Sequence, residues 1–486
     1  MAVMKNEETE NKAEKKKSPF AFERENGWKK ISAEEKDLIE QYSRGYISFL
    51  SEAKTEREAH DIALKQAVDN GYRNLADIIA AGTPLKAGDT VYRSYHGRTL
   101  LLAKIGSKPV AEGVRIVGAH IDSPRLDMKQ IPLYEDSELA YFDTHYYGGI
   151  KKYQWVAIPL AIHGVVMKQD GTKVTIVIGE DDNDPVFTIT DLLPHLGKEQ
   201  AKKSLEEGIA GEGLNLLAGS YPGAEGEGKG KVKEHLLNLL NAKYGIVEED
   251  LQSADIEIVP AGRARECGLD RSMILAYGQD DRICAYPAIK AIFEMKTVPA
   301  FTSIALLCDK EEIGSTGATG MESNFLENTV AEIIAAADGN YSDLKTRRAL
   351  EKSRMISADV NTVHDPNYPD VSAPNGNMAA LNCGIVISKY TGSRGKSGAS
   401  EASAEFMSKI RRIFNDGGVV WQSAELGKVD AGGGGTIAMY LARYGMDVID
   451  CGPGLLSMHA PWEVSSKLDA YMALKAYKAF FMDESI

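Results

Sequence analysis

Cysteine is scarce in this chain. Only five cysteines occur among 486 residues, and no two of them form a CxxC pair. Their odd number and wide spacing argue against a disulfide framework and against cysteine-ligated zinc. We therefore expect free thiols in a reducing compartment, which favours a cytoplasmic protein.

Long apolar runs and an excess of positive charge are also missing. No stretch of about 18 apolar residues occurs, so we expect no transmembrane helix. Residues 1–17 are charged and polar, unlike a secretory signal, and we expect them to form a flexible tail. The net charge of −14 argues against a nucleic-acid partner and against an anionic membrane surface.

What remains is the composition of a large globular protein, 43% hydrophobic and long enough for two or three domains. Strand and helix patterns alternate near both ends, whereas residues 127–262 are β-rich with acidic and glycine-rich loops. We predict an α/β fold with a mixed, mostly parallel sheet sandwiched by helices, built from residues 18–126 and 263–486. Residues 127–262 would form an inserted β-rich domain.

Several elements can be placed individually. Ser32 with Glu35, and Thr55 with Glu58, match the capping box that begins a helix. Leu38, Tyr42 and Phe49 then give a helical apolar stripe. Strands are predicted at residues 114–119, 156–162, 173–178, 303–308, 355–358 and 447–450, and a helix at residues 282–295.

The tetrad at residues 309–312 directly follows the apolar strand at residues 303–308 and contains two adjacent acids, Glu311 and Glu312. Carboxylates at the end of a buried strand are costly unless a cation or a proton compensates them. The pair therefore suggests one metal ligand beside one general base.

Other potential ligands also stand at predicted strand ends, where open α/β sheets bind their ligands. They are His120, Asp280, Asp359 and His459. Asp122 could accept a hydrogen bond from the second nitrogen of His120, and Asp281 could cap the helix that follows it. Each residue alone has a structural explanation, as a satisfied histidine or a capping acid. The ordered combination is harder to explain in that way and indicates a two-metal hydrolytic site.

On these motifs the chain resembles the M18 family of metallo-aminopeptidases, the aspartyl aminopeptidase family. The similar segments are residues 117–124, 309–315, 357–359, 430–437 and 457–459, and the resemblance runs from about residue 30 to the C-terminus. It implies two divalent ions, most often zinc, with cobalt or manganese as alternatives. His120, Asp280 and Asp359 would hold one ion; Asp280, Glu312 and His459 would hold the other.

The resemblance also implies that Glu311 is the general base, with Asp122 counted among the catalytic residues. His163 matches a histidine of the family's inserted domain that reaches the active site of a partner subunit and helps to stabilise the oxyanion. A histidine satisfied at a strand end is the alternative. The family's bridging Asp is commonly followed by Asn, whereas this chain has Asp281, which leaves the ion preference open.

Three residues are candidates for substrate binding. Lys389 lies near the family lysine that pairs with an acidic P1 side chain, and Arg394 and Lys396 are nearby substitutes. His364 could contact substrate or belong to a turn. Gly435 ends a four-glycine run that would allow close backbone approach to substrate.

A second glycine-rich stretch, residues 223–230, has the glycine and lysine spacing of a P-loop. It lacks the final Ser or Thr that would hold magnesium, and its acids would repel phosphate. We interpret it as a flexible loop of the inserted domain.

The function predicted is an aminopeptidase that removes N-terminal residues from peptides, with acidic residues preferred. One alternative is an aminopeptidase of neutral or broad specificity. Others are a dinuclear amidohydrolase or deacylase of small molecules, and a metal-stabilised scaffold without catalysis. By resemblance, the inserted domain would mediate dimerisation within a homo-oligomer, typically a dodecamer.

Overall fold

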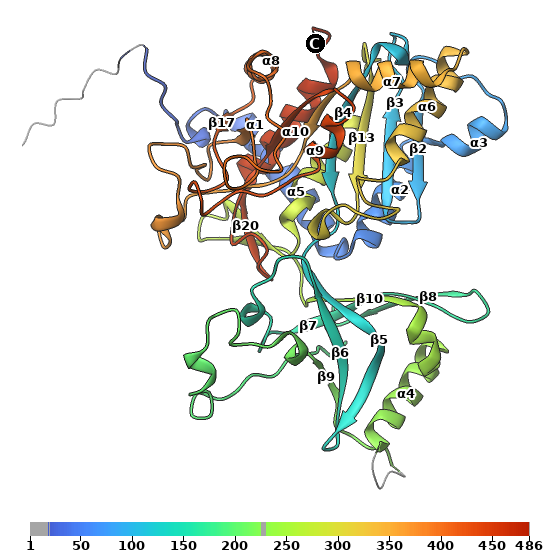
Figure 1. Cartoon of the computed structure of the whole chain (residues 1–486), viewed down its shortest axis with the longest axis vertical. Helices are drawn as coiled ribbons and strands as arrows, with labels where there is room; N and C mark the ends of the chain where they lie inside the picture. Colours follow the sequence, from blue (N-terminus) through green and yellow to red (C-terminus); the bar gives the residue numbers. More distant parts are fainter. Residues whose placement is uncertain (1–17, 19, 225–229, 486) are drawn as a thin grey trace, which may run out of the picture.

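The computed structural model describes residue 18, residues 20–224 and residues 230–485. The predicted tail at residues 1–17 and most of the glycine-rich stretch at residues 223–230 lie outside this part of the chain. Figure 1 shows two bodies, a sheet covered by helices and, beneath it, a second sheet flanked by the helix α4. Within the described ranges, no helix is long and apolar enough to cross a bilayer.

The larger body is built on a nine-stranded sheet. Its centre is parallel, because β4 pairs in parallel with both β13 and β14, and β14 pairs in parallel with β18. Antiparallel pairs lie outside this centre, between β3 and β13 and between β16 and β18. In spatial order the strands are β1 (Arg73–Asn74), β2 (Thr90–Tyr95), β3 (Thr99–Lys104), β13 (Thr302–Cys308), β4 (Val114–His120), β14 (Arg354–Ser357), β18 (Asp447–Gly452), β16 (Ile385–Ser388) and β17 (Trp421–Ser423).

Helices cover both faces of this sheet. Alternate residues of a strand enter opposite cores, as Ile116 and Val117 of β4 do, because successive side chains point to opposite faces. One core is closed by α1 (Ala33–Glu52), α2 (Glu56–Asp69), α5 (Gln279–Phe293), α8 (Ala404–Asp416) and α10 (Lys467–Met482). The other is closed by α3 (Leu75–Ala80), α6 (Phe325–Asp338), α7 (Asp343–Lys352) and α9 (Ala438–Ala442).

The second body is an antiparallel six-stranded sheet with its own apolar core, which includes the fully buried Trp155. The helix α4 (Lys231–Tyr244) packs against this sheet (Figure 1). Its strands, in spatial order, are β8 (Lys173–Ile178), β7 (Leu160–Met167), β10 (Ala254–Pro260), β5 (Arg125–Asp136), β6 (Leu139–Tyr147) and β9 (Leu216–Gly219).

A five-stranded sheet completes the larger body. Its strands are β11 (Arg265–Cys267), β12 (Met273–Ala276), β20 (Glu463–Ser466), β19 (Gly454–Leu456) and β15 (Asn361–Thr362). The pairing of β12 with β20 brings the chain just before α5 beside the chain just after β19. The predicted class, a mostly parallel sheet between helices with a β-rich body attached, is confirmed.

Local predictions were wrong at two places. The strand expected at residues 156–162 begins only at Leu160, because Pro159 has no N–H to donate to a ladder and restricts the residue before it. In α1 the buried stripe runs through Ile39, and Leu38 stays about half exposed. All five cysteines are free thiols, as expected.

The two predicted capping boxes differ in completeness. Thr55 Oγ1 accepts a hydrogen bond from the Glu58 N–H at 3.2 Å, and Glu58 Oε2 accepts one from the Thr55 N–H at 3.0 Å. At the start of α1, Ser32 accepts from the Glu35 N–H, but the Glu35 side chain pairs with Lys475 instead of returning to Ser32. Only the capping box of Thr55 and Glu58, at the start of α2, is complete.

We expect Thr55→Ala to lower the free energy of unfolding by about 1–2 kcal/mol, because the buried hydroxyl satisfies a first-turn amide that nothing else would satisfy. Ser32→Ala, at an exposed half-box, is the matched control and should cost less. Urea unfolding at one protein concentration measures both. Equal losses would contradict the distinction between the two caps.

Candidate active site

A cavity of about 410 Å³ lies at the carboxyl ends of the central parallel strands. It is lined by all six residues predicted as metal ligands or general base, which are His120, Asp280, Glu311, Glu312, Asp359 and His459. A larger groove of about 720 Å³, over α1, α5 and α10, contains none of them. The chemistry-bearing residues are thus gathered in the smaller space.

Asp280 is the centre of this cavity. Its Oδ1 lies 3.2 Å from Nε2 of His120, and its Oδ2 lies 3.1 Å from Nε2 of His459. Glu312 Oε1 is 3.5 Å from the same nitrogen of His459 and has no hydrogen-bond partner among the described residues. One carboxylate therefore faces two imidazoles with separate oxygens, which is the arrangement that a ligand shared between two cations requires.

Both imidazoles are held in the same tautomer. His120 Nδ1 lies 2.9 Å from the carbonyl oxygen of Asp122, and His459 Nδ1 lies 2.9 Å from that of Gly149. A carbonyl oxygen only accepts, so each Nδ1 carries a hydrogen and each Nε2 is the ring nitrogen that faces Asp280. Without a cation, Nε2 can donate to the Asp280 carboxylate; with a cation bound there, the same nitrogen would offer its lone pair as a ligand. Burial lowers the pKa of His459, but its hydrogen bond to Asp280 and the charge of Glu312 raise that pKa to about 11. The surroundings thus attract positive charge, as a cation site should.

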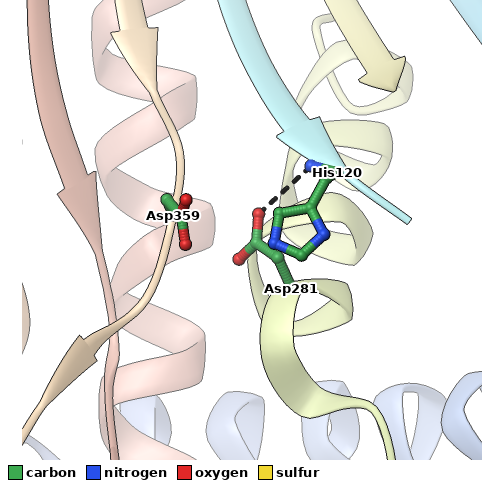
Figure 2. A group of neighbouring side chains, drawn as sticks. All are labelled: His120, Asp281 and Asp359. Carbon is green, nitrogen blue, oxygen red and sulfur yellow. Dashed lines mark hydrogen bonds between the residues drawn. The ribbon is translucent and has the colours of Figure 1, made fainter. Parts of the chain in front are cut away.

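Asp281 does not cap α5, contrary to the prediction. Asp280 and Asp281 have non-helical backbone dihedrals, so the regular part of α5 begins after Asp281, near the predicted start. The Asp281 carboxylate accepts a hydrogen bond from the His120 N–H at 3.3 Å and none from the backbone amides in the first turn of α5. Figure 2 shows this contact, with Asp359 on the facing strand end. Burial, together with the charge of Asp359, raises the pKa of Asp281 well above its ordinary value. A tertiary contact has displaced the local capping preference.

The turn after β13 presents the two glutamates on a short 3-10 helix, η7 (Glu311–Ile313). Lys310 before it has φ +69°, and Asp309 accepts a hydrogen bond from the Thr319 hydroxyl at 2.5 Å. These two residues shape the turn. Burial is the main cause that raises the pKa of Glu311 to about 7, within the range of a group that exchanges protons near neutrality.

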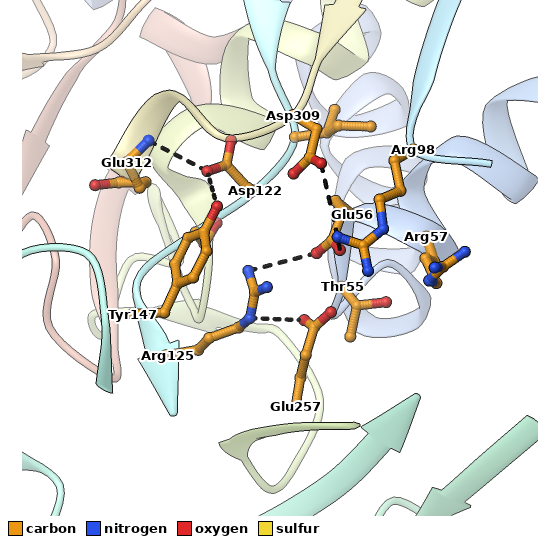
Figure 3. A network of polar contacts seen from close by, with 12 residues as sticks. Thr55, Glu56, Arg57, Arg98, Asp122, Arg125, Tyr147, Glu257, Asp309 and Glu312 are labelled. Carbon is orange, nitrogen blue, oxygen red and sulfur yellow. Dashed lines mark hydrogen bonds and ion pairs between the residues drawn. The ribbon is translucent and has the colours of Figure 1, made fainter. Parts of the chain in front are cut away.

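The Asp122 carboxylate, predicted to accept from His120, lies 3.3 Å from His120 Nδ1, farther than the Asp122 carbonyl oxygen at 2.9 Å. The carboxylate has other, closer partners. It accepts the N–H of Glu311 at 3.1 Å, the N–H of Glu312 at 3.2 Å, and the hydroxyl of Tyr147 at 2.9 Å. Figure 3 shows Tyr147 between Asp122 and Arg125. The guanidinium of Arg125 stacks on the Tyr147 ring, with 3.9 Å from its carbon to the ring centroid. The six-stranded sheet, which carries Tyr147 and Arg125, thus touches the site directly.

Arg125 also belongs to a buried ionic network. Its Nε lies 3.1 Å from Glu257 of β10, and its Nη1 lies 3.4 Å from Glu56 of α2 (Figure 3). Arg98 pairs with the same Glu56 at 3.4 Å. Paired buried charges of this kind fix the orientation of the elements that carry them, here the six-stranded sheet and α2.

Three functional contacts had no counterpart in the sequence prediction: Tyr147, the Gly149 carbonyl, and Glu463. Glu463 is 1% exposed and accepts hydrogen bonds from the N–H groups of Asp280 and His459. The one available signal was an acid within the short stretch 463–466, close after His459.

Of the three residues predicted to bind substrate, one lines the cavity and two do not. Gly435 lines the cavity. Lys389 lies outside its lining and pairs with Glu401 at 3.6 Å, while the substitutes Arg394 and Lys396 line an adjoining pocket of about 220 Å³. His364 is exposed, and its Nδ1 lies 2.7 Å from the Ser372 hydroxyl.

His163 is not among the residues that line the cavity. It is buried on β7, with Nδ1 2.8 Å from Glu58 and Nε2 3.2 Å from Glu180 of the same chain. Its assignment to a partner's active site stays a prediction.

Known proteins match this chain over most of its length. Residues 49–481 match the family model described as Aminopeptidase I zinc metalloprotease (M18). A probable M18 family aminopeptidase 1 of Clostridium acetobutylicum is 55% identical over 94% of this chain and 98% of its own length.

Solved structures agree. Aminopeptidase I from Clostridium acetobutylicum superposes with a TM-score of 0.89 at 52% identity, covering 95% of this chain and 100% of that one. An M18 aminopeptidase from Thermotoga maritima gives a TM-score of 0.89 at 44% identity, covering 95% and 99%. The S. cerevisiae mApe1 dodecamer shares the fold at 20% identity, with a TM-score of 0.73 and coverage of 92% and 97%. The chain therefore belongs to the M18 family of zinc metallo-aminopeptidases, enzymes that remove N-terminal residues.

Proposed function

We propose that this aminopeptidase uses two zinc ions that share Asp280. His120 and Asp359 would complete the ligands of one ion, and Glu312 and His459 those of the other. The observation that carries the proposal is the position of Asp280, whose two oxygens each face a different imidazole at 3.1–3.2 Å. Two imidazoles and three carboxylates are also donors that zinc accepts.

Bound zinc supplies Lewis-acid polarisation of the scissile carbonyl and lowers the pKa of water. The chain supplies the proton transfers. Glu311, with its raised pKa, takes a proton from the attacking water and returns it to the leaving amine. Asp122 fixes the position of Glu311 through the backbone amide. The free N-terminal amine of the peptide would bind beside these carboxylates, which accounts for exopeptidase action.

Substitution of the adjacent residues Glu311 and Glu312 can test whether one is the general base and the other a metal ligand. We expect Glu311→Gln to lower kcat by about 10²–10⁴-fold, the usual contribution of a general base, while both ions remain bound. Glu312→Gln should instead lose one zinc per chain, because it removes a ligand. Metal content by mass spectrometry and hydrolysis of amino-acid anilides measure the two effects. Wild-type turnover of Glu311→Gln with full metal content would remove the base from the mechanism.

N-acetylated peptides separate an aminopeptidase from a small-molecule amidohydrolase or deacylase, because only the aminopeptidase depends on the free amine. Cleavage of the acetylated peptide at the rate of the free one would favour the alternative.

We also propose a preference for acidic N-terminal residues, read by Lys389 together with Arg394 and Lys396. Its support is the nearness of these cations: Lys389 stands two residues before Thr391, which lines the cavity. Broad or neutral specificity is the second candidate, favoured by Glu401, which lies 3.6 Å from Lys389 and 3.0 Å from Lys396 and offsets their charge.

Anilides of Asp, Glu, Leu and Lys distinguish the two. We expect the acidic substrates to be preferred, and Lys389→Ala to lower their kcat/KM by roughly two- to fivefold, the value of one exposed ion pair of about 0.4–1 kcal/mol. The Leu anilide serves as the internal control and should be unaffected. A preference for Leu in the wild-type protein would remove Lys389 from this role and leave the metal chemistry standing.

We propose that residues 127–262 form a dimerisation domain and that dimers build a larger closed assembly, as in the yeast relative. The dimerisation proposal is supported by the long, mostly irregular segment between β8 and β9, the β8–β9 segment, which exposes several large apolar side chains. They are Val186, Leu192, Leu193, Leu196 and Leu205. Contiguous apolar side chains on a surface commonly mark an interface, and these five lie within one segment of the chain. His163 would then act across that interface.

Light scattering after size exclusion should give a mass of several chains. Leu196→Asp should reduce that mass, because the side chain is 68% exposed in the single chain and would be buried on association. Leu269→Asp, at a fully exposed leucine outside the β8–β9 segment, is the matched control and should leave the mass unchanged. An active wild-type monomer would contradict the assembly.

A further inference from the structure

We propose that Glu463 is a positioning residue that holds Asp280 and His459 at the separation that two metal ions require. The inference rests on the proposed two-metal site. It concerns a residue that would contact neither ion nor substrate and would act only through the backbone of two ligands.

The contacts of Glu463 are specific. It is the first residue of β20 and is 1% exposed. Its Oε2 accepts a hydrogen bond from the Asp280 N–H at 3.1 Å, and its Oε1 accepts one from the His459 N–H at 2.8 Å. Each carboxylate oxygen thus serves a different ligand, and the two ligands come from distant parts of the sequence.

The position of Glu463 is itself fixed by its surroundings. Its strand pairs with β12, with Ala276 opposite Glu463. Its carbonyl oxygen accepts a hydrogen bond from Gln279 Nε2 at 2.7 Å, and Gln279 directly precedes Asp280. A rigid carboxylate between two loops can set their spacing, whereas a mobile one could not.

Glu463 differs from most buried carboxylates, which form an ion pair with a lysine or an arginine. Among the described residues its charged neighbours are Asp280 and His459, and no lysine or arginine pairs with it. The charge of Asp280 repels that of Glu463, and His459 and two amide donors offset only part of the cost of burying this carboxylate. Two nearby divalent ions would supply the missing positive charge. This makes the residue easier to explain as part of the metal site than as part of the core.

Asp122 plays the same part on the other side of the cavity. It accepts the N–H groups of Glu311 and Glu312, as Glu463 accepts those of Asp280 and His459. Four site residues are therefore held in pairs by two buried carboxylates. Glu463 holds two ligands of the ion at Glu312 and His459, namely Asp280 and His459, but only Asp280 of the other ion. The ion at Glu312 and His459 should therefore respond more strongly to a change at Glu463.

Glutamine cannot replace this carboxylate, although it has the same shape. An amide has one oxygen, so Glu463→Gln would accept one N–H and turn its own NH₂ toward the other. Asp469, six residues further along, provides a matched control. It is 0% exposed and likewise accepts two backbone amides, from Asn382 at 2.8 Å and Gly384 at 2.7 Å, but neither of these donors is a ligand candidate or lines the cavity.

The experiment is a zinc titration of the full-length protein after removal of metal by a chelator, with wild type, Glu463→Gln and Asp469→Asn compared in competition with a chromogenic chelator. We expect Glu463→Gln to weaken one of the two ions by about 10–100-fold, as supporting residues of metal sites do. The visible spectrum of the cobalt-substituted protein should change as well. Asp469→Asn should match wild type in both measurements.

Two results would overturn the inference: wild-type affinity for both ions in Glu463→Gln, or an equal loss in Asp469→Asn, which would mean a general effect of removing a buried carboxylate. If Glu463→Gln does not fold, Glu463→Asp takes its place, since it keeps the charge but is too short to reach both amides. Wild-type affinity in that variant would equally overturn the inference. Failure of the wild-type protein to bind two ions would instead refute the proposed function.

Discussion

Burial of negative charge is the constraint on which the rest of this structure depends. Asp122, Asp280, Asp281 and Glu463 are each 3% exposed or less, and Glu311, Glu312 and Asp359 join them around one cavity. Such a concentration of acids would be unstable in an apolar interior without protons, cations or directed amide donors. The structure provides the donors, because the backbone amides of five site residues point at these carboxylates. The remaining compensation is what a pair of divalent cations would supply.

The topology of the larger sheet explains how these groups come together. Parallel pairing places the ends of β4, β13 and β14 at the same edge, so His120, the two glutamates and Asp359 emerge side by side. The five-stranded sheet adds the other half, since β12 leads into Asp280 and β19 leads toward His459. The chain therefore needs two sheets to bring five ligand candidates to one point.

The class of fold could be predicted from sequence because β4 and β13 are mostly apolar along their whole length, and runs of that kind are typical of parallel strands buried on both faces. The six cavity residues could be named because each stands at the end of such a run or within an ordered motif. Asp281 was assigned to the wrong contact, since a rule for helix starts cannot anticipate a hydrogen bond to the His120 amide from a distant strand. Glu463, Tyr147 and the Gly149 carbonyl have no sequence pattern, because acceptors for backbone amides and imidazoles are defined only by tertiary placement.

The segment after β6 changes how the six-stranded sheet should be viewed. Tyr147 donates to Asp122, and two residues later the Gly149 carbonyl accepts from His459. A chain in which residue 126 were joined directly to residue 263 would keep every ligand candidate. Yet Asp122 would lose a donor, and the His459 ring would be free to adopt the other tautomer. The six-stranded sheet is therefore not a detachable module: in any chimera between relatives, Tyr147 and Gly149 would have to remain compatible with Asp122 and His459 of the other parent.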